Sequence, residues 1–468
     1  MSEPTIDPYT VREGEEIPPP TNFWSRIKYL GPSVLVAGSI VGSGELILTA
    51  SLGAAAGFGV LWWMLISCWS KSLVQAEITR YIVISGDTYL RALNRIPGKL
   101  SIFGLTKPIA WPLWIGLVAY IPATMSMGGI IGGAGQALTL LGEQAGFVTD
   151  TEMATRWTSG FIALVAIIIL NVGSYKWLEK IMLFLVMGFT FATLVCAIAM
   201  QFTEYRIQPV ELLSFESPLP YAAIAFAAYG YTGVNAGEIS AYTYWCIEKG
   251  YPSFIGPDRE SEGWVDKARG WMKVLHTDVW LTLAILTCAT LPYFVLGAGV
   301  LNKMGERPEG NETINVLSNM FTQTLGPWAV WMFATGAFFI LFSTVLSGIG
   351  GGGRFIPDYL IEMGFFERSN LAARQLCIRV YVTLIPIIGF LIYIKFANPL
   401  LLVIIGGLLT ALTTPIQTGA TIWLQATKMN QEILPGKTAR IALKAIFAFQ
   451  ILMAFMVMWF VVIKPRLG

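Results

Sequence analysis

Eleven segments of this chain are long and apolar enough to cross a lipid bilayer as helices, which takes about 20 mostly apolar residues each. They run roughly over residues 30–56, 57–84, 109–142, 157–174, 177–202, 218–247, 273–301, 326–353, 376–395, 398–427 and 439–463. Inside a bilayer every backbone polar group needs a partner within the protein, which these segments can supply as helices. The sequence therefore predicts an all-α integral membrane protein.

Composition and charge agree with a multi-pass membrane protein. Charged residues make up 13% of the 468 residues, about half the share in a soluble domain. With the N-terminus in the cytoplasm, most of the 31 Lys and Arg residues fall on the cytoplasmic side, and Lys71 lies within a segment. The positive-inside rule then predicts a protein of the inner or plasma membrane with a cytoplasmic N-terminus. Residues 1–25 lack the apolar core of a signal peptide, so we expect a disordered cytoplasmic tail.

The first and sixth segments contain the same short pattern. Residues 41–46 and 234–239 each read Val, any residue, a small residue, Gly, Glu, and then Leu or Ile. Each pattern lies in the opening segment of a set of five, over residues 30–202 and 218–427, and the segment at 439–463 is extra. Because five is odd, the two sets have opposite orientations, as in inverted-repeat transporters. We therefore expect a single transmembrane transport domain over residues 26–464.

Glycines interrupt both of these segments next to a glutamate. Each Gly weakens a helix by about 1 kcal/mol relative to Ala, so the sequence predicts broken first and sixth helices near Glu45 and Glu238. An ionisable residue at membrane depth is by default a functional candidate. The alternative is that each glutamate only caps the helix half that follows it.

If the two breaks face each other, their side chains share one cavity. Repulsion between Glu45 and Glu238 would then let one of them carry a proton at neutral pH. Asn235 would add an amide, and Tyr229 and Tyr231 would add hydroxyls and aromatic faces, although packing is the commoner use of such tyrosines. This hypothesis places a substrate site at the two breaks.

Several functional classes lack their motifs in this sequence. The glycine-rich run at 347–354 does not end in Gly-Lys-Ser/Thr, so it predicts no phosphate-binding loop. The single histidine and five scattered cysteines give no catalytic set, zinc site or disulfide framework. A net charge of +2 does not indicate a nucleic-acid-binding protein. We expect no enzyme activity, no cofactor, no nucleic acid and no obligate protein partner; the expected partners are a small solute or ion and the lipid bilayer.

Five stretches carry a family resemblance: Gly31-Pro32, the broken first segment, Leu61-Trp62, the run from Gln75 to Gly86, and residues 342–348. The first four resemble the first two helices of the Nramp family of divalent-metal transporters, and the fifth resembles that family's eighth helix. The resemblance covers about residues 25–464. It implies a LeuT-like fold of two inverted five-helix repeats plus an eleventh helix, with helices one and six broken. It also implies alternating access and a site at both breaks, and it places backbone carbonyls of Ser39 and Thr232 there.

The departures from the family's pattern concern the metal site. The family's first break reads Asp-Pro-Gly-Asn, and here Gly42 and Glu45 stand at the Asp and Asn positions, with Ser43 replacing Pro. Its sixth-helix Met-Pro-His becomes residues 235–237, Asn-Ala-Gly, and a tenth-helix glutamine falls near Gly407. The thioether that favours soft transition metals is absent. Oxygen ligands remain, and they suit a hydrated magnesium ion or a small organic cation.

The sequence therefore predicts an Nramp-related secondary transporter that moves a small cation by alternating access, with the choice of a proton or sodium as coupling ion left open. The alternatives are a conventional manganese or iron transporter, a carrier of an amino-acid-like zwitterion, or a non-transporting membrane sensor. Glu45, Asn235 and Glu238 would be metal ligands only if the substrate is a metal. The predicted substrate-binding residues are Gly42, Ser43, Glu45, Asn235, Glu238, Ser39, Thr232, Tyr229, Tyr231 and Gly407.

Overall fold

The computed structural model of the chain describes residues 9–30, 42–102, 104, 106–173 and 176–467, without the side chains of 176–183 and 467. Ser39 and Gly31-Pro32 therefore lie outside the described residues. The described part is helical apart from its loops and a short antiparallel pair, β1 (Lys99–Leu100) with β2 (Ile109–Ala110).

The long helices follow the expected segments. They are η1 (Gly44–Thr49) with α3 (Ala50–Ala56), η2 (Gly57–Val60) with α4 (Leu61–Ser85), α6 (Trp111–Ala123) with α7 (Met125–Gln144), α8 (Thr151–Val172), α9 (Lys176–Ala199), α11 (Ala222–Tyr231) with α12 (Ala236–Glu248), α14 (Trp264–Leu296) with η5 (Gly297–Leu301), α17 (Ala329–Glu362), α18 (Leu371–Phe396), α19 (Pro399–Lys428), and α20 (Lys437–Val457) with η8 (Met458–Ile463) and α21 (Lys464–Leu467). Shorter elements connect them: α1 (Phe23–Ile27), α5 (Tyr89–Leu93), η3 (Met200–Phe202), α10 (Pro209–Leu212), η4 (Leu219–Tyr221), α13 (Tyr251–Ile255), α15 (Asn302–Met304), η6 (Gly310–Glu312), α16 (Thr313–Leu325) and η7 (Gln431–Ile433).

Nine helical stretches within the described residues are long and apolar enough to cross a membrane. One of them, Gly44–Ser85, joins the described part of the first segment to the second. The sixth segment is not among the nine, because it is divided into α11 and α12. With these two differences, the structure agrees with eleven spans.

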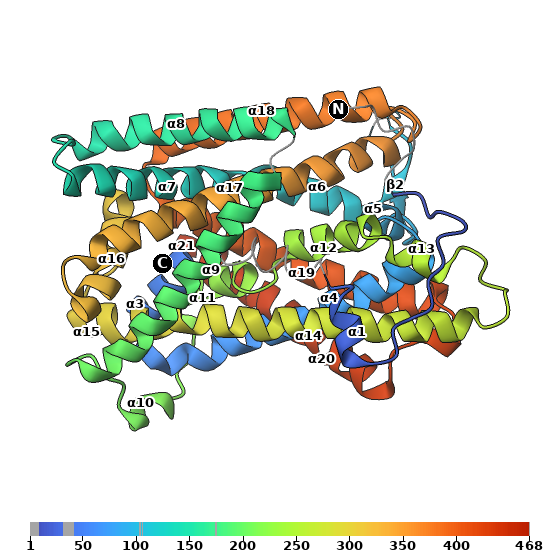
Figure 1. Cartoon of the computed structure of the whole chain (residues 1–468), viewed down its shortest axis with the longest axis horizontal. Helices are drawn as coiled ribbons and strands as arrows, with labels where there is room; N and C mark the ends of the chain where they lie inside the picture. The colour runs from blue at the N-terminus through green and yellow to red at the C-terminus, as the bar shows by residue number, and fades with distance from the viewer. Residues whose placement is uncertain (1–8, 31–41, 103, 105, 174–175, 468) are drawn as a thin grey trace.

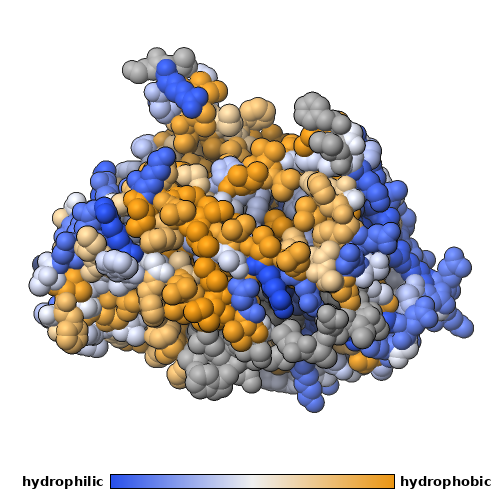
Figure 2. Space-filling model, turned by 90° about the horizontal axis from the view of Figure 1, so that it is seen from above, coloured by the Kyte–Doolittle hydropathy of each residue, from blue (hydrophilic) through white to orange (hydrophobic). Residues whose placement is uncertain are grey.

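The long helices lie side by side along the longest axis of the molecule (Figure 1). The short elements gather at its two ends, which we name after one helix each. The α5 end carries α5, α13 and β2, and the α16 end carries α10, α15 and α16 (Figure 1). The space-filling view shows hydrophobic residues across the middle of one face and hydrophilic residues towards its ends, most densely on the right (Figure 2). This distribution suits a protein whose middle lies in lipid.

The gap between α11 and α12 has a local cause in the sequence. Thr232 leaves the helix with an extended backbone, and Gly233 has a φ of 73°, a left-handed conformation that favours glycine. Asn235 then starts α12 as its N-cap. The sixth helix is thus broken over residues 232–235, as the sequence predicts.

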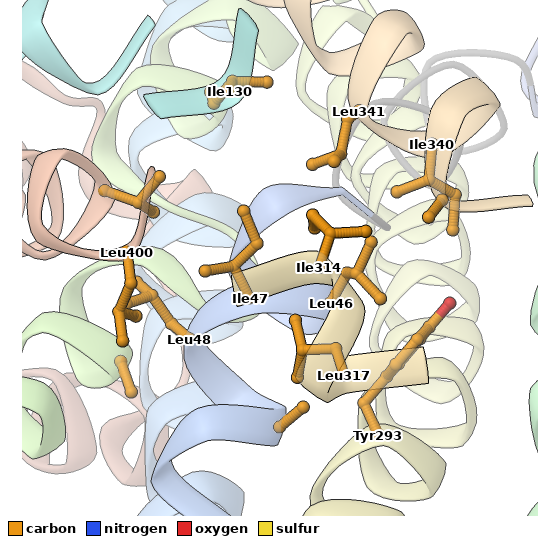
Figure 3. Close-up of a cluster of buried hydrophobic side chains, with 14 of the residues drawn as sticks. Leu46, Ile47, Leu48, Ile130, Tyr293, Ile314, Leu317, Ile340, Leu341 and Leu400 are labelled. Carbon is orange, nitrogen blue, oxygen red and sulfur yellow. The ribbon is translucent and has the colours of Figure 1, made fainter. Parts of the chain in front are cut away.

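Apolar packing places the described part of the first helix at the centre of the bundle. Leu46, Ile47 and Leu48 are fully buried, among side chains of α7, α14, α16, α17 and α19 (Figure 3). Buried apolar residues form one cluster that includes α11 and a second that includes α12. The break between α11 and α12 therefore lies at the boundary between two separately packed regions.

The N-terminal segment differs from the disordered tail predicted over residues 1–25, because its described part packs on the α5 end. Tyr9 is buried, and its ring lies 5.0 Å from that of Tyr244 on α12. The guanidinium of Arg374 lies 5.0 Å from the same ring. The indole of Trp271 donates to the carbonyl of Ile17 at 3.0 Å. These contacts, including a cation–π interaction, hold the N-terminal segment against the helix bundle. The polar composition of the segment does not predict them.

The closest helix contact near the break joins α11 to α19. A Cβ atom added to Gly230 would lie 2.0 Å from the carbonyl oxygen of Gly407, and one added to Gly407 would lie 2.5 Å from that of Ala227. These glycines let the two backbones touch, as small residues do between membrane helices.

We predict that Gly230→Ala lowers the melting temperature of the purified protein, because the new methyl group must push two rigid backbones apart. Gly188→Ala in α9 is the matched control, since nothing lies within 4 Å of its added Cβ and Ala favours a helix by about 1 kcal/mol. Thermal unfolding in detergent measures both variants. Equal melting temperatures for the two would show that this contact does not hold the helices together.

Candidate binding site at the interrupted helices

A cavity of about 260 Å³ extends from the break in the sixth helix towards the α5 end. Helices α5, α6, α7, α12, α17 and α19 contribute to its wall. The glycine-rich part of α17 forms one side, where Gly348, Gly351 and Gly352 leave room. Its polar and aromatic lining residues include Tyr89, Tyr120, Ser126, Tyr231, Asn235, Glu238, Trp245, Thr344, Phe355, Tyr359, Tyr381, Thr410, Thr413 and Gln417.

Glu238 is the only charged residue among the described residues that line this cavity. One of its carboxylate oxygens accepts a hydrogen bond from the N–H of Asn235 at 2.9 Å, and the Asn235 amide oxygen accepts from the N–H of Glu238 at 3.0 Å. This reciprocal pair caps α12. Glu238 is only partly buried, so it caps the helix and faces the cavity at once.

Glu45 has a different environment. It is fully buried and does not line the cavity. One carboxylate oxygen accepts from the N–H of Gly42 at 3.2 Å, and the other accepts from the N–H of Gly233 at 3.1 Å. The hydroxyl of Thr290 donates to it at 3.4 Å. Glu45 thus binds the first helix to the break of the sixth, and the capping role that the sequence left open applies to both glutamates.

Lys71 on α4 is the important residue that the sequence argument passed over. Its side chain is fully buried, and its ammonium donates to the carbonyls of Tyr229 and Thr232, both at 2.5 Å. It also interacts electrostatically with Glu45 and Glu238. A lysine within an apolar segment is by itself the signal that could have singled it out.

The remaining predicted site residues divide between the cavity and the packed core. Tyr231 and Asn235 line the cavity, and the Tyr231 hydroxyl lies 3.3 Å from that of Ser126. The others lie buried behind the wall, at helix contacts or in hydrogen bonds between elements: Gly42, Ser43, Tyr229, Thr232 and Gly407. Ser39 is not among the described residues. The structure therefore brings Tyr231, Asn235 and Glu238 together at one surface.

The predicted metal ligands do not all meet at one point. Asn235 and Glu238 face the cavity, whereas hydrogen bonds from Gly42, Gly233 and Thr290 already occupy the oxygens of Glu45. Within the described parts of the chain, no group of three or more His, Cys, Asp or Glu side chains could hold a metal ion. The described cavity thus offers a cation one carboxylate, an amide, hydroxyls and aromatic faces.

Comparisons with known proteins show the fold. No family model matches the chain. An uncharacterised protein of Pasteurella multocida (strain Pm70) is 25% identical over 340 residues, or 71% of each chain. A manganese transporter of Eremococcus coleocola superposes with a TM-score of 0.63 at 14% identity, covering 97% of this chain and 92% of that one. Mhp1, a nucleobase-cation-symport-1 family transporter with bromovinylhydantoin bound, gives 0.56 at 11% identity, covering 98% and 96%. The chain has the LeuT fold.

We predict that Glu45→Ala lowers the melting temperature more than Glu238→Ala does. The first change leaves two buried N–H groups without an acceptor, at a cost of about 1–3 kcal/mol each. The second exposes one N–H beside a cavity that water can enter. Thermal unfolding of the two purified variants compares them, and a larger loss in Glu238→Ala would contradict these assignments.

Proposed function

We propose that the protein is a secondary transporter whose substrate is a small organic cation bound in the cavity at Glu238. The observation that carries this proposal is the lining, in which a single carboxylate and seven aromatic side chains border one space. The cavity's volume suits a small molecule, since pockets for drug-sized ligands begin near 300 Å³.

The aromatic residues favour an organic cation over a hydrated metal ion. Tyr120, Tyr231, Trp245, Phe355 and Tyr381 all line the cavity. Aromatic faces attract ammonium groups by cation–π interactions, which contribute about 0.5–2 kcal/mol each. A magnesium ion retains its water and prefers carboxylates, of which the described lining has one. The residues that line the cavity therefore fit a small molecule that is partly apolar and carries one positive charge.

The position of the cavity supports an alternating-access mechanism. It lies between the break and the α5 end, where Tyr89, Pro112 and Tyr359 line it. Towards the α16 end, α11 and α19 touch through Gly230 and Gly407. If the N-terminus is cytoplasmic, as the charge distribution indicates, the α5 end faces the cytoplasm. In this conformation the cavity then lies on the cytoplasmic side of the break. Transport would alternate it with a conformation that uncovers the site at the α16 end.

Binding to the purified protein tests the substrate class. We predict that at least one compound from a panel of small primary to quaternary amines raises the melting temperature, since a ligand at 100 times its dissociation constant stabilises by about 2.7 kcal/mol. Glu238→Gln should weaken that binding at least about tenfold, which corresponds to about 1.4 kcal/mol. Glu309→Gln, which alters an exposed carboxylate, should not change it. Uptake of the same compound into proteoliposomes then separates a transporter from a sensor.

A substitution in the wall gives an independent test. Nothing lies within 4 Å of a Cβ added to Gly351, which lines the cavity on α17. We predict that Gly351→Val occupies ligand space, abolishing amine binding and uptake while the melting temperature without ligand is retained. Manganese or magnesium binding and uptake, with no response to any amine, would overturn the proposed substrate class in favour of a metal.

A further inference from the structure

We propose that the ammonium group of Lys71 is a tethered cation that fills a carbonyl site at the end of α11. The break in the sixth helix would then carry a positive charge supplied by the protein itself, and it would need no bound sodium or metal ion at this position. Lys71 lies behind the cavity wall, so its role here is independent of the substrate that the cavity takes.

The hydrogen-bond geometry is that of a cation enclosed by oxygens. Lys71 Nζ lies 2.5 Å from the carbonyl oxygens of both Tyr229 and Thr232, and 3.5 Å from that of Gly230. Carbonyl oxygens only accept hydrogen bonds, and an ammonium group only donates them, through three N–H groups. The number and type of partners therefore match the protonated side chain.

These carbonyls are available because α11 ends here. The last carbonyls of a helix have no partner within it, and they carry the partial negative charge of the helix dipole. The hydroxyl of Ser67, one turn before Lys71 on α4, donates to the same Tyr229 and Thr232 oxygens at 3.0 and 3.1 Å. The ring of Tyr229 lies 5.4 Å from the ammonium. Helix α4 thus presents a donor pair that completes the end of α11.

The charges around Lys71 explain how a buried ammonium is tolerated. A buried charge is costly unless it is paired and hydrogen-bonded. Glu45 and Glu238 both interact electrostatically with Lys71. Glu45 lies in the first turn of η1, and Glu238 lies in the first turn of α12. The ammonium group therefore has two carboxyl groups as electrostatic partners, and Glu238 is the one that faces the cavity.

The empty site itself provides the test. In Lys71→Ala the carbonyl oxygens of Tyr229 and Thr232 lose their cation and leave space that a small cation can enter. The melting temperature is measured without substrate, at constant chloride, with ammonium, sodium or N-methyl-D-glucamine as the cation. We expect the wild type to melt alike in all three salts. We expect Lys71→Ala to melt lower in N-methyl-D-glucamine and to recover saturably in ammonium or sodium.

Two further variants separate the charge from the space it fills. Lys71→Met has a side chain of similar length without charge, so it should be destabilised in every salt and not rescued. Lys303→Ala is the matched control, because Lys303 also donates to a backbone carbonyl, that of Arg206 at 2.9 Å, but is partly exposed. It should show no dependence on the cation.

Two results would overturn the proposed role of Lys71. A Lys71→Ala protein that melts alike in all three salts would overturn it, as would a Lys71→Met protein as stable as the wild type. If Lys71→Ala is too unstable to purify, the yield of folded protein in detergent extracts made in the three salts replaces the melting temperature. The same selectivity for small cations is then expected, and equal yields would overturn the proposal.

Discussion

Breaking a helix inside a membrane frees backbone groups that lipid cannot satisfy, and every feature of this site follows from how they are satisfied. At the end of α11 the freed carbonyls accept from Lys71 and Ser67. At Gly42, just before η1, and at Gly233 the N–H groups donate to Glu45. At the start of α12, Asn235 and Glu238 cap each other's backbone. Each charge thus lies at the helix end whose dipole favours it, positive at the carboxyl end and negative at the amino end.

In this arrangement two charged residues, Lys71 and Glu45, have a structural role, and a third, Glu238, is accessible to a substrate. Lys71 and Glu45 are fully buried and fully engaged, so together they hold the break in shape. Glu238 keeps one oxygen in the α12 cap, yet its side chain lines the cavity. Gly233 permits the break, and Gly230 and Gly407 permit the close contact of α11 with α19. Space therefore lies on one side of the break and dense packing on the other.

Much of this was readable from the sequence. The apolar segments predicted the helices, and the Gly-Glu pattern of the sixth segment predicted the break between α11 and α12, because both signals are local. The break predicted in the first segment lies largely outside the described residues. The sequence did not predict which way the side chains of Glu45 and Lys71 point. Glu45 turns away from the cavity to reach Gly233, which is 188 residues further along the chain, and Lys71 meets carbonyls about 160 residues away. The aromatic wall comes from helices whose individual sequences look like ordinary membrane spans. The packing of Tyr9 depends on Arg374 and Tyr244, which no local pattern connects to it.

We propose that the break is closed by its own charges and that Glu238 alone is left for a substrate. A high-resolution electron cryo-microscopy map of the protein loaded with its strongest-binding amine should then show ligand density between Glu238 and the aromatic wall. It should also show continuous side-chain density from Lys71 to the carbonyls of α11. Ligand or ion density between Glu45 and those carbonyls, with Lys71 displaced, would contradict this proposal.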